Sequence, residues 1–397
     1  MRGRLALTAT GIGVLALAFF LAGIGGEPWL FFDEPAYVSG ARSLLSGTQD
    51  ANPEHPPLAK FFIAGAIKLV GDNPYGWRLA SAVFGAFTLV AIFLWTYLLL
   101  RDYALALTAA ALTLLNNFLF VMSRVAMLDV FYFAFVMWGV LAFTAAILVE
   151  LRLAQRRALL LTSGLLFGLG AACKWNAVVS LAALALVSIV LYIRKTHHLR
   201  EIGLMTLFSG LAVIPVTAYT LAYWLLCHRF HLPFTPHELA ALNMYIWRYH
   251  IQCPGSAALN SPWYRWFFRA SPERGLTYLM GNFVVVWGGL AALGLCIWKF
   301  VRSFLLPEGL VALFYAVNLL QWVVIPQKRL VYYYYYPPAM FLGVAIAIVL
   351  GRANGPRVFG IRVSVLILVA AAVFFLYCYP RMMALEAPYD CMFGCWS

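Results

Sequence analysis

The sequence predicts an all-α protein that crosses a lipid bilayer many times. Of its 397 residues, 64% are hydrophobic and only 11% are charged, whereas soluble globular proteins are about 45–50% apolar and about 25% charged. Because so few charges cannot cover a water-exposed surface, the composition disfavours soluble enzymes, disordered proteins and fibrous repeats. Apolar stretches of about 20 residues, the length that a helix needs to cross a bilayer, recur along the chain.

Eleven apolar stretches are expected to span the membrane. The first follows basic residues, as the core of a signal peptide does. It runs past a typical apolar core into Glu27 and shows no small-x-small cleavage site, so we expect a retained helix. The stretches lie near Leu5–Gly26, Trp77–Leu100, Tyr103–Met122, Leu128–Val149, Ala158–Cys173, Trp175–Ile193, Ile202–Leu226, Leu276–Trp298, Pro307–Ile325, Leu330–Gly351 and Val363–Pro380.

Lysine and arginine residues determine the expected orientation. With the N-terminus in the cytoplasm, every short loop on that side carries at least one basic residue, which is the usual bias of cytoplasmic loops. Most of the net charge of +13 is then explained by orientation and by contact with anionic lipid, without a nucleic acid partner. These basic residues are Arg2, Arg4, Arg101, Arg152, Arg156, Arg157, Arg194, Lys195, Arg200, Lys299, Arg302, Arg352, Arg357 and Arg362.

Two polar segments, Glu27–Gly76 and Cys227–Gly275, are too long to be simple connectors, and both are expected on the outer side. Within the first, Leu58–Val70 is apolar but too short to span, so we expect it to lie along the membrane interface. Only the outer tail Arg381–Ser397 follows the last span. Residues 1–397 are therefore expected to form a single transmembrane domain without a separate soluble domain.

The strongest local feature is a pair of adjacent carboxylates, Asp33 and Glu34, directly after the first span. Ionisable groups at membrane depth are expensive to bury, so they are functional candidates by default. A helix cap is the simpler interpretation, with Asp33 as the cap and Pro35 in an early helical position. Capping does not explain the second carboxylate, so we expect a functional role for the pair.

Cations are expected beside these acids, at the outer ends of several spans. His55 and Lys60 flank a proline-rich entry to the short interfacial helix, where they could bind an anion or, for Lys60, extend to the lipid headgroups. Arg124 and Asp129 could pair with each other, or Arg124 could hold a phosphate. Positive-inside statistics do not account for the outer cations, which also include Arg78, Lys174, Lys328 and Arg329.

Two carboxylates and several cations at a membrane surface fit glycosyl transfer from a lipid phosphate. The cations would hold the phosphate and stabilise it as the leaving group, and a carboxylate would take the proton of the attacking hydroxyl. The sequence contains neither a GxxxxGK[ST] loop nor a GxGxxG turn after a strand, which argues against direct use of ATP or a nucleotide sugar.

Several short motifs occur in order over most of the first 290 residues, and a weaker one follows. Each is modest alone, but the ordered set is specific. They are Phe32-Asp33-Glu34, His55-Pro56-Pro57-Leu58-x-Lys60, Gly71-Asp72-Asn73-Pro74-Tyr75-Gly76-Trp77-Arg78-Leu79, Ser123-Arg124-x-Ala126-Met127-Leu128-Asp129, Asn260-Ser261-Pro262-Trp263-Tyr264-Arg265-Trp266, Gly281-Asn282-Phe283-Val284, and Arg329 with Tyr332–Tyr336.

Together these motifs resemble the protein O-mannosyltransferase family of GT-C membrane glycosyltransferases, which is related to the aminoarabinose lipid A transferase. The resemblance implies a GT-C fold and inverting transfer of a sugar, with mannose favoured, from a polyprenyl-phosphate donor on the periplasmic face of the inner membrane. It implies that Asp33 or Glu34 is the base, with Asp33 slightly ahead. The implied donor or substrate contacts are His55, Lys60, Arg124, Lys174 and Arg329, and Arg78 and Asp129 of the matching motifs are further candidates. Trp263 could stack on a sugar, or it could lie in the aromatic belt at the membrane interface, which is favoured for this residue type.

The acceptor stays open, because the sequence lacks room for the additional soluble domains of some members of the superfamily. A serine or threonine of a protein is favoured, and a lipid acceptor of the lipid A type is the alternative. A transporter or flippase is a hypothesis of another class, but it would place charges at the bilayer midplane in matching halves.

Three smaller features are left as expectations. His228, His231, His237 and His250 crowd the second outer segment, and a divalent metal ion there stays open although no ligand template fits. A disulfide between Cys391 and Cys395 in the tail is also open. Successive residues of a helix point in different directions, so only one or two tyrosines of Tyr332–Tyr336 are expected to point inward.

Overall fold

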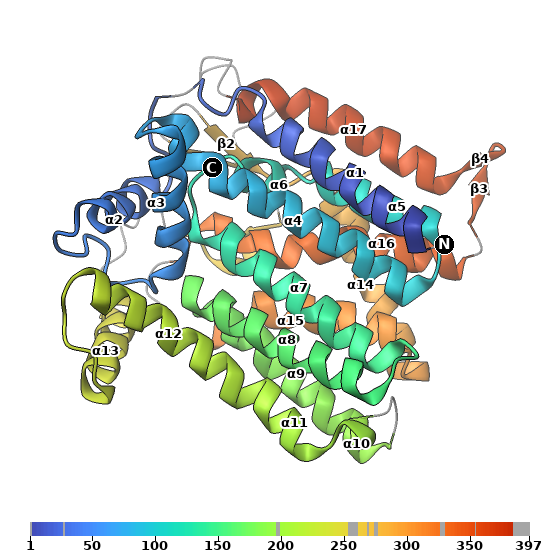
Figure 1. The fold of residues 1–397 in the computed structure, drawn as a ribbon. Helices are drawn as coiled ribbons and strands as arrows, with labels where there is room; N and C mark the ends of the chain where they lie inside the picture. The colour runs from blue at the N-terminus through green and yellow to red at the C-terminus, as the bar shows by residue number, and fades with distance from the viewer. Residues whose placement is uncertain are drawn as a thin grey trace.

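The protein is a bundle of long helices (Figure 1). The computed structural model describes residues 2–26, 28–195, 199–252, 261–267, 270–273, 277–325, 330–353 and 355–383. Within these ranges, 10 helices are long and apolar enough to cross a membrane. The chain is therefore a multi-pass membrane protein, as its composition predicts.

The long helices agree closely with the predicted spans. One of them is continuous through a π-helical turn, and another begins with a 3₁₀ turn. They are α1 (Arg2–Leu21), α4 (Pro74–Leu100), α7 (Leu128–Leu148), α8 (Leu153–Cys173), α9 (Asn176–Ile193), α11 (Leu204–Phe208) with η1 (Ser209–Val213) and α12 (Ile214–Arg229), α14 (Phe283–Ser303), α15 (Leu306–Val324), η4 (Tyr332–Tyr335) with α16 (Tyr336–Arg352), and α17 (Val363–Met382).

The third predicted span, near Tyr103–Met122, is broken. It consists of α5 (Tyr103–Leu114) and the short α6 (Asn117–Met122). Asn116 lies between them, where its side-chain oxygen accepts a hydrogen bond from the Phe118 amide and its Nδ2 donates to a carbonyl oxygen of α16. A polar side chain thus satisfies the backbone groups that a break in a membrane helix releases.

The eighth predicted span begins too early. Residues Thr277–Met280 (β2) pair antiparallel with Ala270–Glu273 (β1), and α14 starts only at Phe283. Asn282 caps this helix, because its side-chain oxygen accepts from the backbone amides of Val284 and Val285. Apolar composition alone could not distinguish the strand from a first helical turn.

The first outer segment forms two short helices, α2 (Glu34–Ser46) and α3 (Leu58–Val70), and α3 has the bounds of the short apolar helix predicted there. Together with α13 (Pro236–Gln252) of the second outer segment, they lie at one end of the bundle, and the N-terminus lies at the other (Figure 1). The remaining short elements are α10 (Leu199–Ile202), η3 (Trp263–Arg265), β3 (Arg357–Val358) and β4 (Ile361–Arg362).

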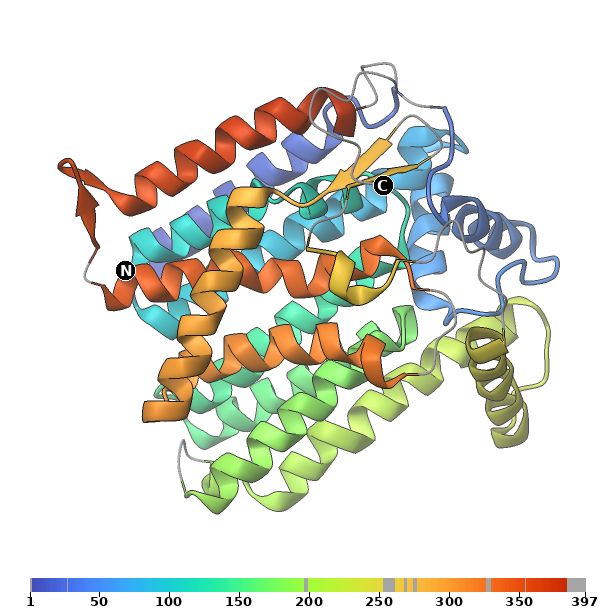
Figure 2. The same cartoon turned by 180° about the vertical axis from the view of Figure 1, so that it is seen from behind.

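Helices α7 and α16 form the centre of the bundle, and α1 and α17 lie at its edge (Figure 2). Because η4 and α16 are covered on all sides, all five tyrosines from Tyr332 to Tyr336 are buried. The expectation that only one or two point inward is therefore wrong. The hydroxyls of Tyr332, Tyr333 and Tyr335 have hydrogen-bond partners inside the bundle, as in the 3.1 Å contact between the hydroxyls of Tyr315 and Tyr335.

Helix α8 approaches η1 and the start of α12 through glycines. A Cβ atom on Gly164 would lie 2.0 Å from the backbone oxygen of Gly210, and one on Gly168 would lie 2.5 Å from that of Pro215. Small residues four apart allow this close backbone contact between membrane helices.

Candidate functional site

The two adjacent carboxylates stand at the turn that leads from α1 into α2. Phe32 has φ of +50°, a left-handed conformation that is uncommon for a residue other than glycine. Asp33 occupies the N-cap position of α2, with Pro35 in the first turn, but its side chain makes no capping hydrogen bond. The strained turn therefore sends the two carboxylates in different directions.

Glu34 is fully buried and its carboxylate is saturated with donors. Arg78 of α4 forms a two-pronged ion pair with it, with Nε 3.0 Å from Oε1 and Nη2 3.1 Å from Oε2. The backbone amide of Phe31 donates to Oε2 at 2.8 Å, and that of Ala126 donates to Oε1 at 2.6 Å. Glu34 thus ties together α2, α4 and the loop before α7.

Arg78 extends this buried connection to the end of α1. Its guanidinium also donates to the carbonyl oxygens of Ile24 and Trp29, at 3.2 and 2.5 Å. A charge-assisted, two-pronged pair of this kind fixes geometry as well as adding stability. In this structure Arg78 and Glu34 hold each other and position the residues beside them.

Asp33, in contrast, lines a cavity of about 140 Å³. The hydroxyl of Tyr333 donates a short hydrogen bond to its Oδ2, and the hydroxyl of Tyr37 lies 3.5 Å from the same oxygen. Burial, and then the charge of Asp33, raise the pKa of Tyr37 well above its ordinary value, so Tyr37 stays protonated. Asp33 is therefore the carboxylate that a substrate could reach.

Two histidines line the same cavity. His55 lies between Tyr37 and His250, with ring centroids 5.4 and 5.0 Å away. Burial lowers the pKa of His55 well below 6.5, and the nearby His250 and Lys174 act in the same direction. His250 comes from α13, where its Nε2 lies 3.1 Å from the backbone oxygen of Glu54. Of the four histidines in the second outer segment, His250 lines the cavity that also contains Asp33.

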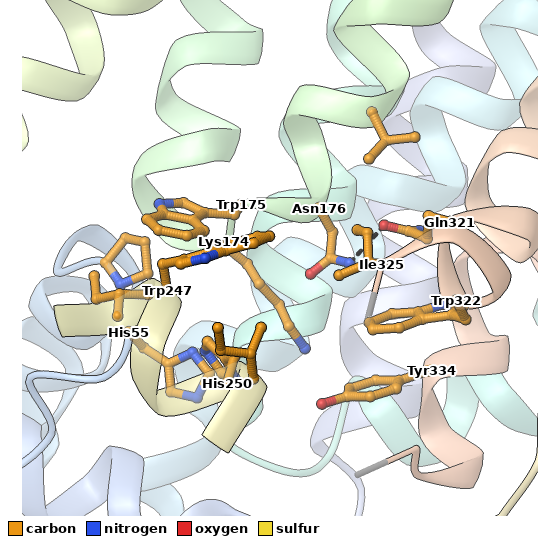
Figure 3. A pocket seen from close by; sticks show the side chains of 14 residues that line it. His55, Lys174, Trp175, Asn176, Trp247, His250, Gln321, Trp322, Ile325 and Tyr334 are labelled. Carbon is orange, nitrogen blue, oxygen red and sulfur yellow. Dashed lines mark hydrogen bonds between the residues drawn. The ribbon is translucent and has the colours of Figure 1, made fainter. Parts of the chain in front are cut away.

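A second cavity, of about 100 Å³, adjoins the first and shares His55, His250 and Tyr334 with it. Figure 3 shows Lys174 reaching into it between His250 and Tyr334. It also contains the amides of Asn176 and Gln321, which hydrogen-bond each other at 2.7 Å. The apolar part of its wall comes from Trp175, Val179, Ile246, Trp247, Ile251, Trp322 and Ile325.

Lys174 connects the acid residues with this second cavity. Its Nζ lies 2.8 Å from both carboxylate oxygens of Asp129 and 4.7 Å from the centre of the Tyr334 ring. Asp129 therefore pairs with Lys174, and the alternative pairing with Arg124 is not formed. Tyr334 in turn stacks on Trp322 with ring centroids 4.0 Å apart.

Lys60 and Arg124 line neither of the two cavities. Lys60 is fully buried, and its Nζ donates to Asp50 and to the backbone oxygen of Asn52. Arg124 donates to the carbonyl oxygens of Phe20 and Ala22 at the end of α1, at 2.6 Å each. Burial lowers the pKa of Arg124 to about 10, so the residue stays charged at neutral pH.

Two further predicted residues are distant or not described. Trp263 is half-buried in η3, outside the lining of both cavities as the described residues define them. Arg329 and the tail cysteines Cys391 and Cys395 lie outside the described residues. In the described part of the chain, no group of three or more histidine, cysteine, aspartate or glutamate side chains could hold a metal ion.

Several residues at the site were not singled out from the sequence. Tyr37 follows Asp33 by four positions, so helical spacing could have placed it on the same face. Asn176 and Gln321 gave no such signal, because they meet only through the packing of α9 against α15.

The sequence resembles known mannosyltransferases. A family model described as dolichyl-phosphate-mannose-protein mannosyltransferase matches residues 54–224. A polyprenol-phosphate-mannose–protein mannosyltransferase of Corynebacterium glutamicum is 29% identical over 255 residues, which cover 52% of this chain and 48% of that protein. One of the same description from Mycolicibacterium smegmatis is 25% identical over 399 residues, covering 81% and 76%. The chain thus spans about half the length of the first relative and three quarters of the second.

The fold is similar to that of solved membrane glycosyltransferases. The S. cerevisiae protein O-mannosyltransferase Pmt1-Pmt2 complex bound to the sugar donor aligns with a TM-score of 0.81 at 14% identity, covering 96% of this chain and 90% of that one. ArnT from Cupriavidus metallidurans bound to undecaprenyl phosphate aligns with a TM-score of 0.65 at 16% identity, covering 94% and 76%. Its ordered motifs, the family model over residues 54–224 and its fold thus make this chain similar to protein O-mannosyltransferases.

Proposed function

We propose that this protein transfers mannose from polyprenyl-phosphate mannose to a hydroxyl group of a protein. The observation that carries the proposal is the position of Asp33, whose carboxylate lines a cavity that adjoins a second one containing Lys174. The descriptions of the relatives from C. glutamicum and M. smegmatis support the donor and the acceptor class.

In the proposed reaction, Asp33 is the general base. The acceptor hydroxyl oxygen forms a bond to the anomeric carbon of the sugar, and its proton passes to Asp33. The bond between that carbon and the phosphate oxygen breaks, and its electron pair leaves with the phosphate. A single displacement of this kind inverts the configuration at the anomeric carbon. Tyr333 and Tyr37 would hold the Asp33 carboxylate in place.

The donor phosphate would lie near Lys174. An ammonium group balanced by Asp129 can still offer a donor to a phosphate oxygen, and it would stabilise the negative charge that develops on the leaving group. The amides of Asn176 and Gln321 supply further neutral donors. The polyprenyl chain would leave this cavity along its apolar wall, where Trp247 is 42% exposed.

Glu34 would act through position alone. Its carboxylate already accepts four hydrogen bonds and is 0% exposed, so it has no room for a proton from a substrate. It would hold the strained turn that directs Asp33 into the cavity. Lys60, Arg78 and Arg124 would likewise stabilise the outer end of the bundle without touching the donor.

The orientation is part of the proposal. The basic loops and the N-terminus would face the cytoplasm, and the end formed by α2, α3 and α13 would face the periplasm of a cell membrane. An acceptor protein would then reach the site after its export across the membrane. The lipid-linked donor would reach the same site from the outer leaflet of the bilayer.

The test is incubation of the purified, reconstituted chain with labelled polyprenyl-phosphate mannose and a mixture of exported proteins and membrane lipids. Label entering protein with the wild-type chain but not with Asp33→Asn supports the proposal. Asp102→Asn, at the opposite end of the bundle, is the matched control and should transfer normally. Label that enters lipid would show that the acceptor is a lipid and not a protein. Uptake of a solute without transfer of the label would favour a transporter.

A further inference from the structure

A large cavity of about 740 Å³ lies at the opposite end of the bundle from Asp33. It is bordered by the end of α4, the start of α5, the end of α16 and the β3–β4 hairpin that leads into α17. It is large enough for the headgroup of a phospholipid. The charged residues of its lining are Asp102, Arg352, Arg357 and Arg362.

The charges around this cavity favour an anion. Arg352 is balanced by Glu308, with its Nε 2.7 Å from the carboxylate. Asp102 is engaged as the cap of α5, where it accepts from the Leu105 amide at 3.0 Å. Arg357 and Arg362 also line the cavity, and neither forms an ion pair with a described residue. The first turn of α17 adds the partial positive charge of a helix N-terminus beside them.

The hairpin between these arginines has an apolar tip. Val358 and Ile361 are 45% and 48% exposed, and Phe359 is 99% exposed. Phe359 and Gly360 have φ of +50° and +77°. The phenylalanine thus occupies a left-handed conformation that is unfavourable for it, and its exposed ring makes no packing contact with the described part of the chain that would offset the strain. The hairpin projects past the end of the bundle (Figures 1 and 2).

An apolar tip flanked by two arginines matches the membrane interface. Aromatic and aliphatic side chains enter the acyl region there, while guanidinium groups remain at the level of the phosphates. We propose that the cavity binds the phosphate of an anionic phospholipid through Arg357 and Arg362, with the tip at Phe359 inserted beside it. A lipid is favoured over free phosphate because a soluble anion would give the apolar tip no partner.

The inference concerns lipid binding and is independent of the proposed mannosyl transfer. It is tested by native mass spectrometry of the full-length protein in detergent, titrated with phosphatidylglycerol and, separately, with phosphatidylcholine. The variant Arg357→Gln/Arg362→Gln removes both guanidinium groups. The matched control Arg194→Gln/Arg302→Gln removes two arginines from the same end of the bundle, where they cover the rings of Phe304 and Trp298 outside the cavity.

The wild-type protein should retain phosphatidylglycerol in preference to phosphatidylcholine. Arg357→Gln/Arg362→Gln should weaken the affinity for phosphatidylglycerol by roughly 30-fold, and the control pair should weaken it much less. Phe359→Asn tests the tip, because asparagine tolerates the left-handed position and should keep the turn while lowering lipid affinity.

Three outcomes would overturn the inference. One is equal retention of the two lipids, and another is an equal loss of affinity in the two double variants. The third is competition by inorganic phosphate at a concentration matching the lipid, which would identify a site for a soluble anion instead.

Discussion

The adjacent residues Asp33 and Glu34 should respond in opposite ways to the same chemical change. Glu34→Gln removes the charge that balances Arg78 in a fully buried pair. A glutamine oxygen can replace only part of the four hydrogen bonds, because its amide group would face donors where Glu34 has an acceptor. Leaving one buried charge without its partner costs about 3–5 kcal/mol.

Asp33→Asn should be nearly neutral for stability. Asp33 is half-buried and the asparagine oxygen can still accept from Tyr333, so the free energy of unfolding should change by less than about 1 kcal/mol. Transfer should fall by about 10²–10⁴-fold, the usual contribution of a general base. One variant thus loses activity with its fold intact, whereas its neighbour loses stability first.

The two effects are separable by measuring both quantities on each variant. Denaturant titration in mixed micelles, followed by tryptophan fluorescence, gives the free energy of unfolding. Transfer of labelled mannose gives the rate per folded molecule. The double variant Glu34→Gln/Arg78→Gln should be destabilised by less than the sum of the two single variants, because the pair is lost only once.

The reasoning would be refuted by the reverse pattern. If Asp33→Asn keeps full turnover while Glu34→Gln is stable and inactive, Glu34 is the base. If both variants are stable and active, neither carboxylate takes the proton.

Three further predictions concern pH, the Lys174 pair and helix packing. Burial holds the pKa of His55 in the folded protein below 6.5, so on acidification the unfolded chain binds this proton before the folded protein does. The contribution of His55 to the free energy of unfolding is therefore complete above pH 6.5 and is lost as the pH falls toward the folded-state pKa. His55→Gln should flatten this pH dependence between about pH 7.5 and about pH 5.5 in the same denaturant titration. Lys174→Met should lower the free energy of unfolding by about 3–5 kcal/mol, because it leaves buried Asp129 unpaired. The double variant Lys174→Met/Asp129→Leu should recover much of that stability but not the transfer of mannose. Full recovery of mannose transfer would show that Lys174 serves only the fold. Gly164→Ala should lower the free energy of unfolding by about 1–3 kcal/mol, because the new Cβ meets a backbone oxygen. In Gly294→Ala the new Cβ has no atom within 4 Å, so this variant should be neutral or stabilising. Equal thermal unfolding of the two variants would contradict the close approach of α8 to η1 and α12.

Much of the fold follows from the one-dimensional pattern of apolar residues. Spans such as Leu128–Leu148 and the short helix Leu58–Val70 were predicted nearly to the residue, because a bilayer demands helices of a set length with their backbone groups paired internally. The break at Asn116 and the strand at Thr277–Met280 were missed. Both depend on partners far along the chain, which hydropathy cannot identify.

The sequence also singled out Asp33, His55 and Lys174, which line the two adjoining cavities, but it did not predict their contacts. Asp33 and Glu34 were predicted as a pair with Asp33 slightly ahead, and their separate directions depend on the turn at Phe32 and on Arg78, which comes from α4. Their separate roles remain predictions. The burial of Tyr333 and its neighbours was predicted wrongly, because helical geometry does not reveal that a helix is surrounded on every side.

By itself, the sequence determined that the chain lies in a membrane, which ends of its helices carry the acids and cations, and which family it resembles. These properties are local, since they depend on the solvation of single side chains and on short motifs. Only the tertiary structure decided which charges neutralise one another, Lys174 with Asp129 and Arg78 with Glu34. It also decided that Arg124 donates to the carbonyl oxygens at the end of α1. Ion pairing depends on distances of a few ångströms between different helices, and those distances are set by packing.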